Sequence, residues 1–206
     1  MADIYLLNCK KLKQQITSLS QQISPERRQK ALKMKKNSAA LNLLGAELCL
    51  CYALSLCLPL SPKKDGNGKP FIEGEKQFNI SHSGDYVVCV VSPNAVGVDI
   101  EEISRMSGKV FDRICSPKER QMALSIEIDR LEKYFCRVWT RKESILKLSG
   151  IGIRQKLSEV CTESSSLFLS SLEIDSSYML SVCLEKQETL TTHFITAENI
   201  KQYFNI

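Results

Sequence analysis

The sequence has few of the residues that build zinc or disulfide sites. It contains two histidines among 206 residues, and its nine cysteines are odd in number and scattered along the chain. Cys49 and Cys51 form the one close pair, which lacks the spacing of a zinc knuckle or a redox motif. With only His82 and His193 to complete a tetrahedral set, we expect no structural zinc site and we expect buried, reduced thiols. Any metal should therefore bind oxygen ligands.

The sequence also lacks a targeting signal. Residues 1–15 have no long apolar core behind a basic start, so we expect neither a signal peptide nor a transit peptide, and a cytoplasmic protein. One apolar run, residues 39–60, approaches the length of a membrane span. It contains Asn42 and Glu47 near its middle and is closed by Pro59. Because an acid at mid-span costs about 2.5–3.5 kcal/mol, we expect a buried helix of a globular domain and no membrane partner.

No low-complexity linker divides the chain, and no internal repeat is evident. Helix starts are predicted at Ser24 and Ser116, because each serine stands in an N-cap position before a proline. Pro93-Asn94 is typical of a tight turn and predicts a β-hairpin between the strand patterns that flank it. Strand patterns cover 77–80, 86–92, 95–101, 165–173 and 178–185, and helical patterns cover 129–148 and 197–204. The chain is therefore expected to mix α and β elements.

The net charge of +5 is modest but unevenly distributed. A basic cluster follows the first predicted helix start and holds one acid, Glu26; its members are Arg27, Arg28, Lys30, Lys33, Lys35 and Lys36. Such a cluster is typical either of a solvated helix face or of a surface that binds anions. A module that binds nucleic acid is one candidate function, although the run lacks the interleaved aromatic residues that favour it.

Two acidic residues share one face of a predicted strand. Asp99 and Glu101 alternate with apolar residues in the segment 95–101, so their carboxylates point to the same side. Adjacent like charges repel one another unless water screens them or a cation lies between them. The pair is therefore either part of a solvated sheet face or a set of hard oxygen ligands, which would suit Mg²⁺.

The helical pattern at 129–148 carries a lysine within its apolar stripe. Lys142 lies among stripe residues of helical period, which are Leu131, Tyr134, Phe135, Val138, Ile145 and Leu146. It either extends past the apolar surface to water or reaches a bound anion. Glu143 and Lys147 are spaced i and i+4, which by itself predicts an ion pair on the helix surface.

Residues 78–84 bring small hydroxyl side chains and a histidine from a strand end into a turn at Gly84. Such groups can donate hydrogen bonds to a phosphate. A hydrolase pair of His82 with Ser81 or Ser83 is disfavoured, because neighbours on a strand point to opposite faces and no G-x-S-x-G elbow is present. A magnesium phosphohydrolase that acts on nucleotides would use the same acids and lysines, with water as its nucleophile.

Four short blocks contain these residues and follow one another along the chain. They are Gly68-Lys69-Pro70, Phe78-Asn79-Ile80-Ser81-His82-Ser83, Gly97-Val98-Asp99-Ile100-Glu101 and Trp139-Thr140-Arg141-Lys142-Glu143-Ser144-Ile145-Leu146-Lys147. In order and spacing they resemble the signature blocks of Sfp-type 4′-phosphopantetheinyl transferases. The resemblance extends to residues 24–30, 43–45 and 150–152 and covers most of the chain apart from its C-terminal end.

The resemblance implies an α+β fold of two similar halves with pseudo-twofold symmetry, in a monomer. The expected division is residues 1–94 for the N-terminal half and 95–206 for the C-terminal half, which carries the metal-binding acids. It also implies the reaction, which is Mg²⁺-dependent transfer of 4′-phosphopantetheine from coenzyme A to a serine of an apo acyl or peptidyl carrier protein, with release of 3′,5′-ADP. Carriers of fatty acid, polyketide and non-ribosomal peptide synthesis all qualify.

The resemblance assigns roles to the acids and lysines of the third and fourth blocks. Asp99, Glu101 and Glu143 would hold Mg²⁺, or Mn²⁺, against the pyrophosphate of coenzyme A. Lys142 and Lys147 would neutralise phosphate charge, and Lys147 would assist the leaving group. Glu143 could instead take the proton of the carrier serine, so metal ligand and general base are both open for this residue.

The remaining assignments concern the nucleotide. By the same resemblance, the contacts to the nucleotide and its 3′-phosphate are expected from Arg27, Lys30, Lys69 with its neighbour Pro70, Ser81 and His82. Glu119 matches an acid that serves as a base or as a carrier contact. The sequence departs from the family at Leu41 and Asn42, where relatives commonly carry an arginine and a threonine, so one phosphate contact is expected to be lost or replaced.

Overall fold

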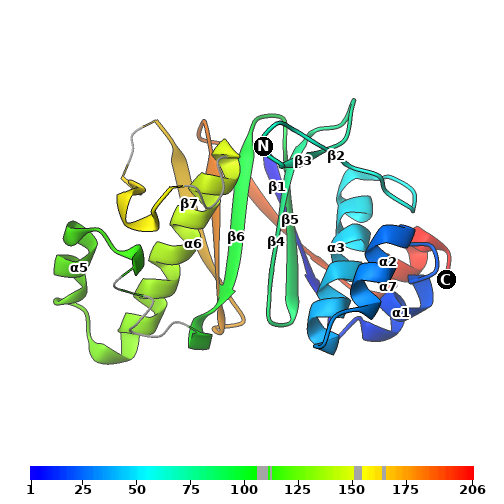
Figure 1. The fold of residues 1–206 in the computed structure, drawn as a ribbon, viewed down its shortest axis with the longest axis horizontal. Coiled ribbons are helices and arrows are strands. Elements are labelled where there is room, and N and C mark those ends of the chain that lie inside the picture. The colour runs from blue at the N-terminus through cyan, green and yellow to red at the C-terminus, as the bar shows by residue number, and fades with distance from the viewer. Residues whose placement is uncertain (106–110, 112, 151–154, 164–165) are drawn as a thin grey trace.

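Two β-sheets pack face to face at the centre of the structure, and helices cover the outer face of each sheet (Figure 1). The computed structural model describes residues 1–105, 111, 113–150, 155–163 and 166–206. The layers run in the order helices, four-stranded sheet, three-stranded sheet, helices. This arrangement confirms the predicted α+β class.

The first sheet has the strand order β4-β5-β1-β9. Its strands are β1 (Ala2–Asn8), β4 (Gln77–Ser83), β5 (Tyr86–Ser92) and β9 (Leu190–Ile195). β1 pairs antiparallel with β5 and parallel with β9. Both faces of β5 are covered, which explains why every residue of this strand is buried and why its sequence is almost entirely apolar. A short ribbon of β2 (Lys63–Lys64) and β3 (Pro70–Phe71) stands apart from this sheet.

The second sheet has the antiparallel order β6-β8-β7. Its strands are β6 (Val96–Glu102), β7 (Phe168–Ile174) and β8 (Tyr178–Leu184). Val98 and Ile100 of β6 join the apolar cluster between the two sheets. Because side chains alternate along a strand, Asp99 and Glu101 point to the opposite face, where the long helix α6 lies.

The helices form two outer layers (Figure 1). Over the first sheet lie α1 (Lys13–Leu19), α2 (Pro25–Leu32), α3 (Asn37–Leu54) and α7 (Ala197–Phe204). Over the second sheet lie α6 (Leu131–Ser149) and, beyond it, α5 (Pro117–Ala123). Short 3₁₀ turns occur at η1 (Ile103–Arg105), η2 (Ile128–Arg130) and η4 (Leu157–Glu159).

Helix α3 is the predicted apolar helix. It has the length and composition of a candidate membrane span, and 56% of it is buried within this structure. Its single acid, Glu47, is 1% exposed and accepts hydrogen bonds from Ser24 N at 2.9 Å, Ser24 Oγ at 2.7 Å and Leu60 N at 3.0 Å. The Arg27 Nε atom lies 3.2 Å from the same carboxylate. The charge inside the helical layer is therefore fully partnered.

Most predicted elements are present, with shifted ends. The helix predicted from Ser24 ends at Leu32, and α3 begins at Asn37, before the apolar run expected at residues 39–60, and ends at Leu54. β4 continues through Ser83 and includes the residues expected in a turn. The strand predicted from residue 165 begins at Phe168, and residues 164–165 and 151–154 lie outside the described part of the chain. The sequence did not predict β1, α1 or β9.

The predicted hairpin around Pro93-Asn94 is wrong. β5 pairs with β4 and β1, whereas β6 pairs with β8 in the other sheet. The turn has the local chemistry of a hairpin, but it carries the chain from one sheet to the next. Both edges of β5 are already paired, with β4 and with β1, so β6 cannot pair with it. The partner of β6 is instead β8.

The predicted boundary between residues 94 and 95 falls where the chain passes from the first sheet to the second. The C-terminal segment, however, returns to the first sheet. β9 completes the first sheet beside β1. α7 follows it, and Tyr203 Oη donates to Leu56 O at 3.0 Å and to Cys51 O at 3.3 Å. Residues 190–204 therefore belong structurally with the N-terminal half, although the expected division placed them in the C-terminal half.

All nine cysteines are free thiols, as expected, and seven of them are buried. Cys57 and Cys161 are exposed, so the expectation of burial is wrong for these two.

Strand β6 and helix α6 approach each other closely at Gly97. A Cβ atom on this residue would lie 1.9 Å from Ser144 O and 2.5 Å from Leu148 N, both main-chain atoms of α6. No side chain can therefore be accommodated between β6 and α6 at this point. Glycine here lets the helix lie directly against the strand.

We predict that Gly97→Ala lowers the free energy of unfolding by about 3 kcal/mol or more, because overpacking against main-chain atoms cannot be relieved by a rotamer change. Urea denaturation measures the loss. Gly66→Ala is the control, since a Cβ there meets nothing within 4 Å, and it should change stability by less than about 0.5 kcal/mol. Equal stability of the two variants would contradict the close contact.

Candidate functional site

A pocket of roughly 320 Å³ lies where β4, β6 and α6 meet, between the two halves of the molecule. Its lining consists of Ile80, Ser81, His82, Asp99, Glu101, Trp139, Glu143 and Lys147. β4 supplies Ser81 and His82, and β6 supplies both acids of the predicted Asp-x-Glu pair. Trp139, Glu143 and Lys147 are spaced by four residues and so share one face of α6. The structure thus brings together predicted residues from three of the four blocks.

Lys147 is the pocket's ammonium group and is held by the strands. Its Nζ donates to Asp99 Oδ1 at 2.6 Å and to Ser81 Oγ at 2.9 Å. The Ser81 hydroxyl in turn donates to Asp99 Oδ1 at 2.8 Å. The ion pair that the i, i+4 spacing predicts between Lys147 and Glu143 is therefore replaced by a pair with Asp99, which Gly97 brings close to the helix.

The carboxyl groups of the pocket disfavour one another's charge. Burial raises the pKa of Glu143 above its ordinary value; the Asp99 and Glu101 carboxylates raise it further, while Lys147 opposes the shift. Burial also raises the pKa of Asp99, against the opposing effect of Lys147. Asp99 Oδ2 is buried without a hydrogen-bond partner among the described residues. These are the properties expected where an additional cation would stabilise the carboxylates.

The pocket residues fit a divalent cation in donor type and charge. Three carboxyl groups and one ammonium line it, so it carries two excess negative charges when all four are ionised. Asp99, Glu101 and Glu143 are hard oxygen donors of the kind that Mg²⁺ takes, usually one or two at a time. They do not form a ready-made cluster, because no group of three histidine, cysteine or acidic side chains in the described ranges is arranged to hold a metal ion.

His82 adds an imidazole to the lining of the pocket. Partial burial lowers the pKa of its imidazole, and the positive charge of Lys147 lowers it further. The ring is therefore expected to be neutral at physiological pH, with one nitrogen able to donate a hydrogen bond and the other able to accept one.

Lys142 and Glu119 lie elsewhere and bind each other. Lys142 is completely buried, and its Nζ donates to Glu119 Oε2 at 2.6 Å and to Ile114 O at 2.7 Å. Glu119 also accepts from Ser116 N at 2.7 Å as part of the helix cap of α5. Lys142 therefore neither extends to water nor reaches a phosphate, and the phosphate contact implied for it is corrected. Its ion pair with Glu119 fixes α5 against α6.

The other residues expected at the nucleotide lie outside this pocket. Arg27 pairs with Glu47, as described above, and Lys30 is exposed on α2. Lys69 Nζ donates to Val96 O at 2.9 Å and Leu148 O at 3.3 Å, and burial lowers its pKa. Pro70 lies beside it in β3. The nucleotide roles of these four residues stay predictions.

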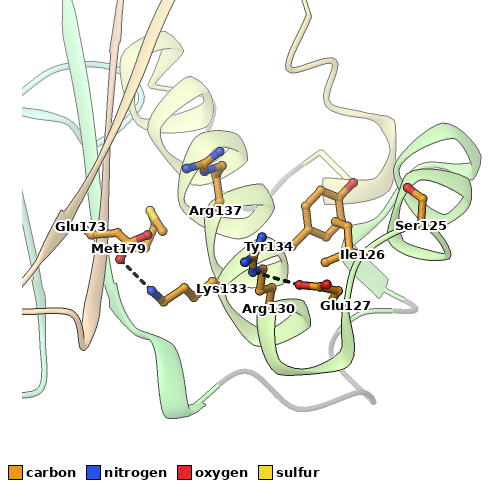
Figure 2. A pocket seen from close by; sticks show the side chains of 9 residues that line it. All are labelled: Ser125, Ile126, Glu127, Arg130, Lys133, Tyr134, Arg137, Glu173 and Met179. Atoms are coloured by element: carbon orange, nitrogen blue, oxygen red, sulfur yellow. Dashed lines mark hydrogen bonds and ion pairs between the residues drawn. The ribbon is translucent and has the colours of Figure 1, made fainter.

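A larger pocket lies on the other side of α6 (Figure 2). Its volume is about 640 Å³, and none of the predicted site residues lines it. Two of its basic side chains already have acidic partners, since Arg130 pairs with Glu127 and Lys133 with Glu173. Size alone would favour this pocket, but the convergence of acids, lysine and histidine favours the smaller one.

Comparison with known proteins finds relatives in sequence and a partial likeness to a solved structure. The model of the 4′-phosphopantetheinyl transferase superfamily matches residues 95–197. A 4′-phosphopantetheinyl transferase of Bacillus pumilus is 30% identical, over 97% of this chain and 95% of that relative. The 4′-phosphopantetheinyl transferase Sfp of Bacillus subtilis is 28% identical, over 78% of this chain and 81% of its own length. The crystal structure of a Thermotoga maritima holo-[acyl-carrier-protein] synthase is similar over 45% of this chain and 64% of its own, with 21% identity and a TM-score of 0.39.

The chain belongs to the 4′-phosphopantetheinyl transferase superfamily. Its relatives with long matches are of the Sfp type, which confirms the family and the enzyme class predicted from the sequence.

We predict that Glu143→Gln makes the protein more stable at high pH but not at low pH. A raised pKa in the folded state means that ionising Glu143 opposes folding. This cost is absent while the group is protonated in both states and appears as the pH rises through the raised folded value. Melting temperatures measured from about pH 4 to about pH 8 should therefore show a gain for the variant that grows with pH.

Glu132→Gln serves as the control for that measurement, because Glu132 is an exposed residue of the same helix. It should show no such gain at high pH. A Glu143→Gln variant that is less stable than the wild type at high pH would contradict the crowding of carboxylates in the pocket.

A second prediction concerns the buried ion pair. Glu119→Gln leaves the Lys142 ammonium buried without a countercharge and should cost about 3–5 kcal/mol of unfolding free energy. Adding Lys142→Met should recover much of this loss, since the buried charge is then removed. Glu163→Gln breaks the exposed pair with Lys118 and should cost less than about 1 kcal/mol in the same denaturation experiment.

Proposed function

We propose that this enzyme transfers the 4′-phosphopantetheine group of coenzyme A to a serine of an acyl or peptidyl carrier protein, and that the pocket of Asp99, Glu143 and Lys147 is its active site. The observation that carries the proposal is the convergence of Ser81, Asp99, Glu143 and Lys147 at one pocket between the halves. Family membership supports the identity of the transferred group.

The reaction requires a site that tolerates negative charge. The serine oxygen forms a bond to the phosphorus that bears the pantetheine arm, the bond from this phosphorus to the bridging oxygen of the pyrophosphate breaks, and 3′,5′-ADP leaves. A pocket with excess negative charge would repel a pyrophosphate. We therefore propose that Asp99, Glu101 and Glu143 hold Mg²⁺, with Mn²⁺ as an alternative, which would neutralise the carboxylates and polarise the phosphate.

The protein's own groups have distinct tasks in this proposal. Lys147 places a positive charge beside the site where charge develops on the leaving group. His82 lines the pocket, and its ring N–H suits a phosphate oxygen, whereas Ser81 donates its hydroxyl proton to Asp99 and orients that carboxylate. Glu143, whose pKa is raised, is also suited to take the serine proton, because a base works best when its pKa lies near the working pH.

Two further observations support the proposed location and oligomeric state of the enzyme. The nine free thiols support a cytoplasmic location, and the packing of two sheets within one chain supports a monomer that needs no second copy to form the cleft. A nucleic-acid module does not account for three carboxyl groups in one pocket. A magnesium phosphohydrolase would account for them, but family membership favours transfer over hydrolysis.

Incubation with coenzyme A, Mg²⁺ and an apo carrier protein tests the proposal. Mass spectrometry of the carrier should show the added phosphopantetheine, and a carrier whose serine is replaced by alanine should stay unmodified. Asp99→Ala and Lys147→Ala should each reduce the rate by about 100-fold or more. Lys201→Ala, which removes an exposed lysine of α7, should leave the rate unchanged. Failure with carriers of all three pathways would overturn the proposal.

A further inference from the structure

The two sheets meet at an unusual junction between β4 and β6. Each is an edge strand of its own sheet. Three side chains of β4 accept hydrogen bonds from main-chain N–H groups of β6: Val98 N donates to Asn79 Oδ1 at 2.9 Å, Ile100 N to Ser81 Oγ at 3.4 Å and Glu102 N to Ser83 Oγ at 3.2 Å. Side chains here take the place that main-chain carbonyls have in an ordinary sheet.

The contacts follow one spacing. Asn79, Ser81 and Ser83 alternate along β4, so they share one side of the strand. Each binds the N–H of the β6 residue 19 positions later in the chain. A constant offset means that the two strands run in the same direction, and a strand slip by one residue would break all three contacts.

The two serines each make a second contact, and it repeats with the same period. Ser81 Oγ donates to Asp99 Oδ1 at 2.8 Å, and Ser83 Oγ donates to Glu101 Oε2 at 2.6 Å. A hydroxyl has one proton to donate. Because the N–H of β6 approaches each serine oxygen as a donor, the serine proton is directed to the neighbouring carboxylate, and this restricts the carboxylate's rotation.

We infer that Ser83 is a positioning residue for Glu101, in the same way that Ser81 positions Asp99. Ser83 is buried, with 3% of the residue exposed, and it does not line the pocket. It therefore acts on the pocket through the Glu101 carboxylate and not through contact with substrate. The inference rests on the proposed function, in which Glu101 is a metal ligand.

The direct test is Mn²⁺ binding, measured by electron paramagnetic resonance in the presence of coenzyme A and without a carrier. Ser83→Ala should raise the dissociation constant for Mn²⁺ by about 10- to 100-fold, the usual effect of removing a partner of a metal ligand. Ser83→Thr keeps the hydroxyl and should stay within about threefold of the wild type. In the transfer assay, Ser83→Ala should raise the Mg²⁺ concentration for half-maximal rate while the rate at saturating Mg²⁺ changes little.

Ser92→Ala is a matched control. Ser92 is also buried, its hydroxyl accepts from Asn94 N at 3.0 Å and donates to Glu188 Oε1 at 3.2 Å, and it lies at the opposite end of the β4–β5 pair. Ser92→Ala removes two hydrogen bonds of the same kinds as Ser83→Ala does, one accepted from a main-chain N–H and one donated to a carboxylate. It should therefore lower the melting temperature to a similar extent without changing Mn²⁺ binding. If Ser83→Ala does not fold, Ser83→Cys keeps the volume, and its weak donor should give an intermediate dissociation constant.

Unchanged Mn²⁺ binding in the folded Ser83 variant, or an equal loss in Ser92→Ala, would overturn the inference. So would a wild-type protein that binds no Mn²⁺. The proposed transfer reaction is judged separately: a wild-type protein that binds Mn²⁺ in a Ser83-dependent way but modifies no carrier would refute the reaction and leave the positioning role intact.

Discussion

The direct contact of β6 with α6 at Gly97 is the constraint on which the site depends. With main chain against main chain, the next residue on this face of the strand, Asp99, lies within ion-pair distance of Lys147, which stands between the two contact points at Ser144 and Leu148. Any side chain at position 97 would push the helix away and separate the two charges. The glycine of this motif is therefore part of the site even though it carries no functional group.

The same helix uses its two motif lysines in opposite ways. Lys142 points into the protein and forms an ion pair with Glu119, so its charge stabilises the packing of α5. Lys147 lies five residues further along, which rotates it to the face of β6, and its side chain is 29% exposed. A helix of 3.6 residues per turn can thus separate a structural cation from one that faces the pocket within a single short motif.

The sequence was most informative where local rules govern. Alternation placed Asp99 and Glu101 on one face, and the helix-start chemistry at Ser24 and Ser116 located α2 and α5. It was least informative where distant segments decide the outcome. Pro93-Asn94 has the residues of a hairpin turn, but strand pairing between β6 and β8 overrides them. Likewise, no local pattern predicts that Glu119 pairs with Lys142, because the two become neighbours only when α5 packs against α6.

For the hydroxyl side chains of β4, the sequence predicted the location but not the contacts. Their resemblance to phosphate-binding groups predicted their location at the site, and Ser81 does line the pocket. The contacts of Asn79, Ser81 and Ser83 to β6 were not predicted, because nothing in a single strand indicates that its side chains will face the edge of a second sheet. Their alternation, which is visible in the sequence, is the one signal that could have suggested it.

The pairing of β1 with β9 has a consequence for how the chain acquires its fold. The parallel neighbour of β1 is β9, with Ala2 opposite Leu190, so this sheet cannot be completed until residues 190–195 have been synthesised. Contacts of such long range are costly to close and slow a folding reaction. During translation, one edge of β1 therefore stays unpaired until β9 has been made.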